Sequence, residues 1–153
     1  MIESKKNCIV YLVRTSEKDL EDLNKSLELL ETNLLAFSPN TDIIIFHESS
    51  FELSRVIIPK NKSWFRFVCV TFPEPPAGTL EIFPHPLPEQ VAMGNLGFSI
   101  GYRHMCWFFS GGLYDQPIMQ NYKYYLRLDT DSYLLSPLNY DIFEMMSNGC
   151  YKY

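Results

Sequence analysis

The chain has 153 residues, of which 46% are hydrophobic and 15% aromatic, which is enough for one packed domain and too apolar for a disordered chain. The formal net charge is −5 and the lysines and arginines are scattered, which argues against a broad electrostatic grip on nucleic acid or anionic lipid. Because no apolar run approaches the roughly 18 residues that span a bilayer, no membrane contact is expected within this chain.

The first part of the chain predicts a strand, a helix and two further strands. Residues 8–13 form a continuous apolar run, as in a strand covered on both faces. Ser16 and Asp19 resemble a capping box. The leucines that follow recur at spacings of three and four, which predicts an amphipathic helix carrying Leu20, Leu23, Leu27, Leu30 and Leu34. Residues 42–48 and 65–72 read as strands, so the order favours a right-handed βαβ start and a mostly parallel sheet flanked by helices.

Residues 73–88 form a proline-rich loop. They contain six prolines, which remove amide donors and block helix formation. No charge or composition typical of a domain linker accompanies them, and both flanking segments look like parts of one core. We therefore interpret the loop as a flap within a single domain that comprises residues 1–153.

The last third predicts helices and strands in alternation. Residues 97–110 form an apolar, aromatic helix that carries Tyr102, Arg103 and His104, with Gly111-Gly112 as its end. The further expected elements are a short helix at 115–121, strands at 124–128 and 133–135, and a helix at 140–147 that ends near Gly149.

Two carboxylates, Asp129 and Asp131, come directly after the expected strand 124–128. In open α/β sheets ligands bind outside the carboxyl ends of the strands. In an extended segment both side chains point to one side and Thr130 points away, so both can reach one cation. Mn²⁺ and Mg²⁺ prefer oxygen ligands and leave positions for phosphates and water. The sequence thus predicts a Mn²⁺ or Mg²⁺ site shared with a diphosphate, to which Arg103 and Arg127 can add positive charge. Arg14, at the end of the first strand, is either a contact to an anionic ligand at the same edge of the sheet or a surface arginine.

An alternative interpretation of D-T-D-S is a solvated turn in which Asp and Ser side chains bond to backbone amides. Other reactive side chains have structural interpretations as well. His104 on an apolar helix is interpreted as a hydrogen-bonded core histidine. The four cysteines form no CxxC pair, and each is expected to be a small buried apolar residue.

Three segments together resemble the fungal α-1,2-mannosyltransferases of glycosyltransferase family 15. They are CIVYLVRTSEKDL, GYRHMCWFFSGGLYDQPIMQNYKYY and LRLDTDSYLLSPLNYDIFEMM. The YRHMC string followed by YY-x-R-x-[acid]-x-D is more specific than a DxD alone. The family pattern has E-P-D where this chain has D-T-D, and its catalytic domain continues well past this motif. The chain therefore looks like the N-terminal, donor-binding half of a GT-A fold.

This resemblance implies a metal-dependent transfer of mannose, with retention, from GDP-mannose to a mannoside acceptor on a glycan or glycoprotein in the Golgi lumen. By matching motif, the donor-binding residues are Arg14, Tyr102, Arg103, Arg127 and Asp129, and the metal ligands are Asp129 and Asp131. The catalytic residue is left unassigned, because it is expected in the acceptor half. Two alternatives stay open: an inactive nucleotide-sugar-binding module, and an aspartate-nucleophile phosphatase in which Asp129 attacks phosphate.

Overall fold

The computed structural model describes residues 6–58, 64–74 and 100–151. It divides into two compact units, one formed by residues 1–70 and 120–153 and the other by residues 71–119. Most of the predicted proline-rich loop, from residue 75 to residue 88, lies outside the described residues. No helix among the described residues is long and apolar enough to cross a bilayer.

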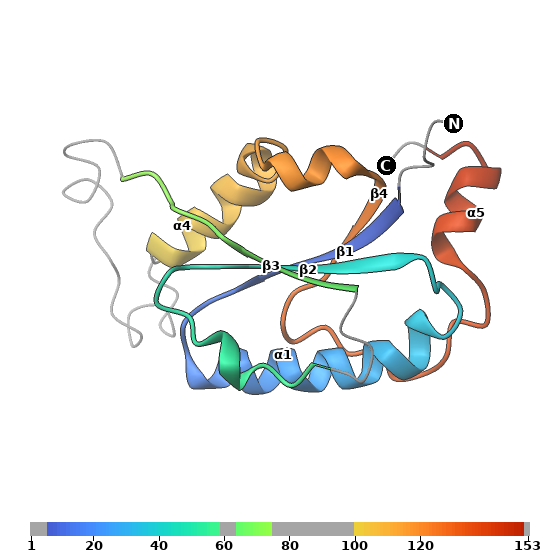
Figure 1. Cartoon of the computed structure of the whole chain (residues 1–153), viewed down its shortest axis with the longest axis horizontal. Coiled ribbons are helices and arrows are strands. Elements are labelled where there is room, and N and C mark those ends of the chain that lie inside the picture. The colour runs from blue at the N-terminus through green and yellow to red at the C-terminus, as the bar shows by residue number, and fades with distance from the viewer. Residues whose placement is uncertain (1–5, 59–63, 75–99, 152–153) are drawn as a thin grey trace, which may run out of the picture. The chain divides into compact units, whose positions relative to one another are not determined.

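The larger unit is built on a four-stranded parallel sheet (Figure 1). Its strands are β1 (Lys6–Val13), β2 (Thr41–His47), β3 (Phe65–Cys69) and β4 (Tyr122–Arg127). The order across the sheet is β3-β2-β1-β4, so β1 pairs with β2 on one side and with β4 on the other. In register, Val10 of β1 lies between Ile44 of β2 and Arg127 of β4. The parallel α/β sheet predicted from the sequence is confirmed.

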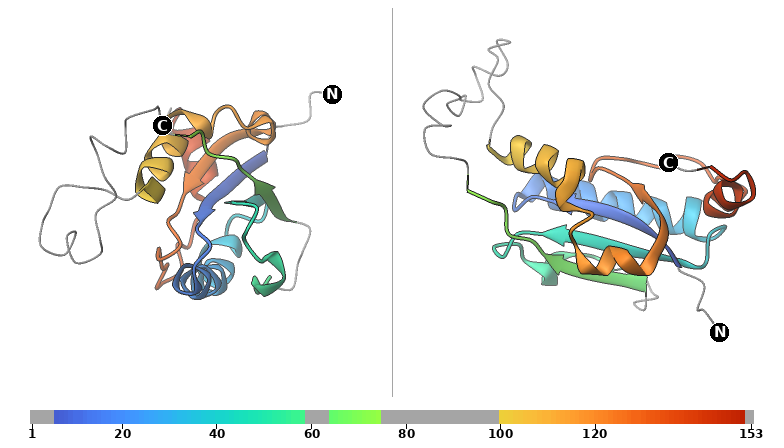
Figure 2. Two further views of the ribbon diagram at one scale, coloured as in Figure 1. Left: turned by 90° about the vertical axis from the view of Figure 1, so that its left-hand side faces the viewer. Right: turned by 90° about the horizontal axis from the view of Figure 1, so that it is seen from above.

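Helix α1 (Glu17–Leu30) packs along one face of this sheet. Its N-cap is Ser16, whose hydroxyl accepts the amide hydrogen of Asp19 at 3.1 Å, as the predicted cap requires. A π-helical turn, Glu31–Leu35, continues the helix. Seen along the strands, α1 lies end-on below the sheet (Figure 2, left). The predicted leucine stripe is buried, with Leu20, Leu23, Leu27, Leu30 and Leu34 between 0% and 6% exposed.

The two central strands, β1 and β2, are buried on both faces. Ile9, Tyr11 and Ile43 pack with the α1 leucines in one core cluster. Val10 and Ile44, which point to the opposite face, are also 0% exposed. This two-sided burial explains why both strands read as continuous apolar runs rather than as alternating patterns.

The polypeptide after β4 does not form the short strand predicted at 133–135. It runs along α1 instead, where Asn33 donates its side-chain amide to the carbonyl oxygen of Leu134 at 2.5 Å. The backbone amide of Leu138 donates to the carbonyl of Asn33 at 3.0 Å. The predicted strand is therefore wrong, because the backbone groups of this segment bond to a helix rather than to a neighbouring strand.

Helix α5 (Ile142–Asn148) closes the larger unit. Asp141 caps it by accepting the amide of Phe143 at 2.9 Å, and Gly149 ends it as predicted. Ser38, just before β2, donates to the same Asp141 carboxylate at 3.1 Å. Helix α5 thus lies at the end of the sheet where the strands begin, which we call the amino end (Figure 1).

The smaller unit contains α4 (Ile100–Trp107) and a π-helical turn, Phe108–Gly112. A short 3₁₀ helix, Pro117–Asn121, begins in this unit and ends at the first residues of the segment 120–153 of the larger unit. The predicted helix over 97–110 is confirmed from residue 100 on. The prediction that every cysteine is buried is wrong for three of the four. Cys8 is buried in β1, whereas Cys69, Cys106 and Cys150 are exposed.

Candidate functional site

The carboxyl ends of β1 and β4 form the candidate site. The chain builds β1, β2 and β3 outward in one direction and then returns to place β4 on the other side of β1. The strand order therefore reverses between β1 and β4, and in open α/β sheets ligands bind at this reversal, outside the carboxyl ends of the strands. Arg14 directly follows β1, and Arg127 is the last residue of β4.

Asp129, Thr130, Asp131 and Ser132 form a tight turn directly after β4, which we call the acidic turn. The amide of Ser132 donates to the carbonyl oxygen of Asp129 at 2.9 Å, and the amide of Asp129 donates to the Ser132 hydroxyl at 3.1 Å. The extended geometry predicted for this segment is therefore wrong, because Ser132 supplies the bonds of a turn. Thr130, between the two exposed carboxylates, is buried at 8% exposed.

Arg127 holds the first carboxylate of the turn. Its Nε and Nη2 atoms donate to Oδ1 of Asp129 at 3.2 and 2.9 Å. The two side chains are 39% and 60% exposed, so solvent weakens the pair to about 0–1 kcal/mol. The bonds orient Asp129 and leave its second oxygen, Oδ2, without a hydrogen bond to any described residue.

Asp131 is the less engaged of the two carboxylates. It is exposed, and it makes no hydrogen bond or ion pair with the residues that the structure describes. The negative charge of Asp131 nevertheless affects the pKa of the nearby Tyr133 phenol. The pKa of Tyr133 is raised to about 12, mainly by the hydrogen bond to Asp22, and the charge of Asp131 adds to this shift.

Arg14 lies at the same end of the sheet with its side chain 68% exposed. Its guanidinium pairs with Asp19 of α1 at 3.1 Å. Asp19 also bonds to the N-cap hydroxyl of Ser16. Arg14 is thus positioned over the first turn of α1 and remains accessible to an anion from solvent.

The donor set fits a divalent cation whose remaining ligands come from a substrate. The described residues contain no group of three or more His, Cys, Asp or Glu side chains that could hold a metal by themselves. The acidic turn offers two carboxylates, and Mn²⁺ or Mg²⁺ commonly takes one or two protein carboxylates together with phosphate and water oxygens. Asp129 and Asp131 can therefore hold such an ion only with a ligand such as a diphosphate.

Tyr102 and Arg103 lie on α4, in the unit of residues 71–119, so their predicted contact with the donor stays a prediction. Tyr102 is 42% exposed, and a hydrogen bond with Cys106 raises the pKa of its phenol. His104 stacks on Phe72 with ring centroids 4.6 Å apart. Its Nε2 atom is buried without a hydrogen-bond partner among the described residues, so the hydrogen bond expected at this histidine is not found for that atom.

Two features of this end of the sheet were missed by reasoning from the sequence. One is a cavity of about 130 Å³ between the start of α1 and the segment after β2, lined by Thr15, Ser16, Glu17, Leu20, Phe51, Glu52 and Arg55. The other is Ser26, which donates to the carbonyl oxygen of Ser132 at 2.6 Å. A serine between the core leucines Leu23 and Leu27 was a signal that could have revealed it.

Sequence comparison finds relatives among fungal mannosyltransferases. Residues 87–153 match the sequence model of the family described as glycolipid 2-alpha-mannosyltransferase. The probable mannosyltransferase KTR3 of Saccharomyces cerevisiae is 39% identical over 69 residues, which cover 42% of this chain and 17% of that protein. The alpha-1,2 mannosyltransferase KTR1 of the same yeast is 44% identical over 57 residues, which cover 37% of this chain and 14% of that protein.

Structure comparison extends the likeness to nearly the whole chain. Core-mannan synthase A from Aspergillus fumigatus, crystallised in a Mn/GDP form, matches with a TM-score of 0.72 at 23% identity, over 97% of this chain and 41% of that one. The mannosyltransferase Ktr4p of S. cerevisiae in complex with GDP matches with a TM-score of 0.67 at 20% identity, over 96% of this chain and 39% of that one. These structures show that the fold is GT-A-like, and the chain spans less than half of their length.

Proposed function

We propose that this chain, whose residues 87–153 match the glycolipid 2-alpha-mannosyltransferase family, glycosyltransferase family 15, binds GDP-mannose together with Mn²⁺ or Mg²⁺ at the carboxyl end of its sheet. The observation that carries this proposal is the acidic turn. It presents two exposed carboxylates where the strand order reverses, at the same end of the sheet as Arg14, which follows β1. The Mn/GDP form of a relative with the same fold supports the choice of ligand.

In this proposal Asp131 and Asp129 are the protein ligands of the cation. Asp131 is available because no described residue bonds to its carboxylate, and Asp129 is oriented through Oδ1 by Arg127. A divalent cation held by these two carboxylates would supply Lewis-acid stabilisation of the diphosphate charge. Arg127 balances the local negative charge, which otherwise raises the cost of placing two carboxylates close together.

The arginines give the site its affinity for anions. Arg14 is exposed at the same end of the sheet, and a diphosphate can compete with Asp19 for its guanidinium, because arginine binds phosphate oxygens well in a two-pronged geometry. Tyr102 and Arg103 of the YRHMC string are proposed as further contacts to the donor nucleotide or sugar. We assign no residue of this chain as the catalytic group.

The proposed reaction is transfer of mannose, with retention, from GDP-mannose to a mannose-containing glycan or glycoprotein acceptor in the Golgi lumen. The family supports this choice of reaction. The second candidate is a module that binds the nucleotide sugar without turnover, through the same acidic turn and arginines. Mannose transfer or donor hydrolysis by the purified protein excludes this second candidate, whereas binding without either supports it.

Calorimetric titration of GDP in the presence and absence of Mn²⁺ tests the proposal. We expect binding only with Mn²⁺, and a melting temperature that rises with both ligands, because they stabilise the folded state alone. Removing a residue that only orients a metal ligand lowers metal affinity by about 10–100-fold. Asp131 is proposed as a ligand itself, so Asp131→Asn should weaken Mn²⁺-dependent binding by more than about 100-fold.

The matched control is Glu28→Gln, which removes one exposed carboxylate from the outer face of α1. Its side chain is 72% exposed and pairs only with Lys25 among the described residues. This variant should bind Mn²⁺ and GDP like the parent protein. Equal binding by the parent protein and Asp131→Asn would show that the acidic turn is a structural turn and not a metal site.

A further inference from the structure

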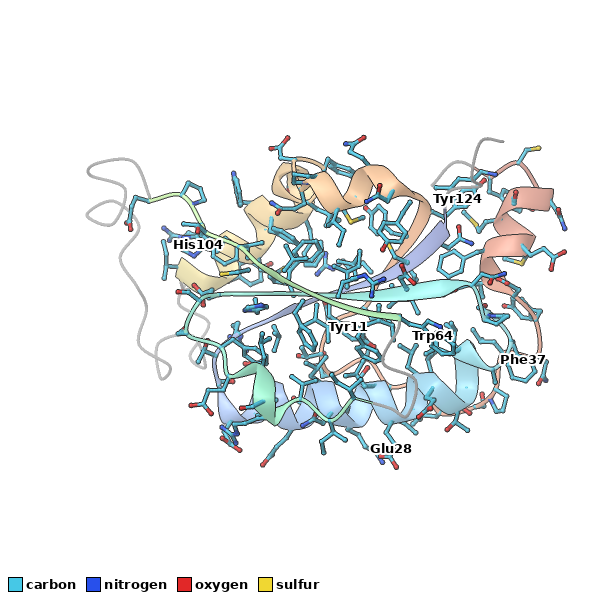
Figure 3. All side chains as sticks on the ribbon, in the orientation of Figure 1. Tyr11, Glu28, Phe37, Trp64, His104 and Tyr124 are labelled. Carbon is cyan, nitrogen blue, oxygen red and sulfur yellow. The ribbon has the colours of Figure 1, made fainter. Side chains whose placement is uncertain are left out.

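A buried hydrogen-bond chain reaches the acidic turn from the core. The Tyr11 hydroxyl of β1 lies 2.8 Å from the Ser26 hydroxyl of α1, and Ser26 donates to the carbonyl oxygen of Ser132 at 2.6 Å. Tyr11 lies between the sheet and α1 (Figure 3). The chain of bonds therefore joins β1, α1 and the acidic turn.

The direction of these bonds follows from the number of hydrogens. A serine hydroxyl has one hydrogen, and a carbonyl oxygen can only accept. Because Ser26 donates to Ser132, it must accept from Tyr11. Burial raises the pKa of Tyr11 to about 12, so the phenol keeps its proton, and remains a donor, at neutral pH.

Ser26 stands at a position that otherwise belongs to the apolar face of α1. It is 1% exposed and lies between Leu23 and Leu27, both 0% exposed. Serine is a weaker helix former than leucine, and a buried hydroxyl is unfavourable unless it is hydrogen-bonded. Here the hydroxyl has both a donor and an acceptor as partners. The bond to Ser132 thus gives a physical reason for a serine at this point of the core.

Ser132 in turn sets the conformation of the acidic turn. Its amide donates to the carbonyl oxygen of Asp129, and its hydroxyl accepts the amide hydrogen of Asp129. Its own carbonyl is the group that Ser26 holds. All three polar groups of Ser132 are therefore engaged, two with Asp129 and one with the core.

We propose that Ser26, oriented by Tyr11, is a positioning residue that fixes the acidic turn so that Asp129 and Asp131 are held ready for a cation and a diphosphate. The inference rests on the function proposed above for these carboxylates. Removing a group that holds metal ligands lowers metal affinity by about 10–100-fold. We expect about a tenfold loss of Mn²⁺-dependent GDP affinity in Ser26→Ala, and a smaller loss in Tyr11→Phe, which leaves the bond from Ser26 to Ser132 in place.

The test combines amide hydrogen exchange with titration of GDP in the presence of Mn²⁺. In Ser26→Ala the amide of Asp129 should exchange about tenfold faster than in the parent protein, while the amides of β4 keep their rates. The matched control is Tyr122→Phe, which also removes a tyrosine hydroxyl with one hydrogen bond, at 2.9 Å to Asp42, but at the amino end of the sheet. This control should leave the exchange at Asp129 and the GDP affinity unchanged.

Unchanged exchange at Asp129 in Ser26→Ala overturns the inference, as does faster exchange with unchanged Mn²⁺-dependent affinity. If the parent protein itself shows no Mn²⁺-dependent binding of GDP, the proposed function fails, and the exchange rates alone show whether Ser26 anchors the turn. Should Ser26→Ala not fold, Tyr11→Phe decides the question by the same two measurements. Equal losses of affinity in Tyr11→Phe and Tyr122→Phe would show a general effect of stability and overturn the inference.

Discussion

The amino and carboxyl ends of the sheet use their polar side chains in opposite ways. At the amino end, Tyr122 donates to the buried carboxylate of Asp42, and Ser38 donates to Asp141. At the carboxyl end, the side chains of Arg14 and Asp129 are 68% and 60% exposed and make ion pairs that water can reach. One end closes the fold, and the other keeps charged groups accessible to a ligand.

Solvation explains this difference. A carboxylate as buried as Asp42, which is 4% exposed, is stable only when it is hydrogen-bonded or paired, so its partners become part of the folded structure. Exposed charges keep most of their hydration and contribute little to folding, which leaves them free to exchange partners. The three predictions that follow test this contrast, from the largest expected effect to the smallest.

Alkaline pH should destabilise the protein through its buried neutral groups. Burial is the main cause that raises the pKa of Cys8 and of Tyr11, each to about 12, and it also raises the pKa of Tyr122. A raised pKa in the folded state means that the stabilisation is complete below the unfolded pKa, about 9 to 10 for these groups, and is lost as the pH rises towards 12. Each such group lowers the free energy of unfolding by about 1.4 kcal/mol per pH unit within that range.

Urea unfolding between pH 8 and pH 11 measures this loss. The phenylalanine in Tyr11→Phe cannot ionise. The free energy of unfolding of this variant should therefore fall less steeply with pH than that of the parent protein. A decline of equal slope in both proteins would contradict the assignment to Tyr11.

Tyr122→Phe should destabilise the amino end without affecting ligand binding. It removes the hydrogen bond to the buried Asp42 carboxylate, and hydrogen bonds to charged groups contribute about 1.5–3 kcal/mol. Urea unfolding at pH 7 should show a loss of that size. The control is Tyr140→Phe at an exposed tyrosine, which should change the free energy of unfolding by no more than about 0.5 kcal/mol. Similar values for the two variants would remove the basis for regarding the amino end as the closed end.

Arg127→Gln at the carboxyl end should have the smallest effect on folding. The pair with Asp129 is partly exposed, so the free energy of unfolding should change by less than about 1 kcal/mol. A loss above about 2 kcal/mol would mean that the carboxyl end also stabilises the fold, and the contrast between the two ends would fail.

The sequence predicted those parts of the fold whose pattern is local. The leucine stripe of α1, its cap at Ser16 and the apolar strand runs follow from the 3.6-residue period and from burial on both faces. The position of Asp129 and Asp131 at a strand end was also predicted, because the apolar run of β4 stops just before them. Their conformation was not predicted, because the residues D-T-D-S are compatible with an extended segment as well as with a turn.

The amino acid sequence by itself determined the parallel sheet, the helix that covers it, and the place of the carboxylates. Tertiary structure decided the rest. Side chains more than 100 positions earlier in the chain, Ser26 and Asn33, bond to the backbone of Ser132 and Leu134 and turn a predicted strand into a segment that runs along α1. Local periodicity carries no information about such partners, because a backbone carbonyl accepts a hydrogen bond from whichever donor the folded chain brings to it.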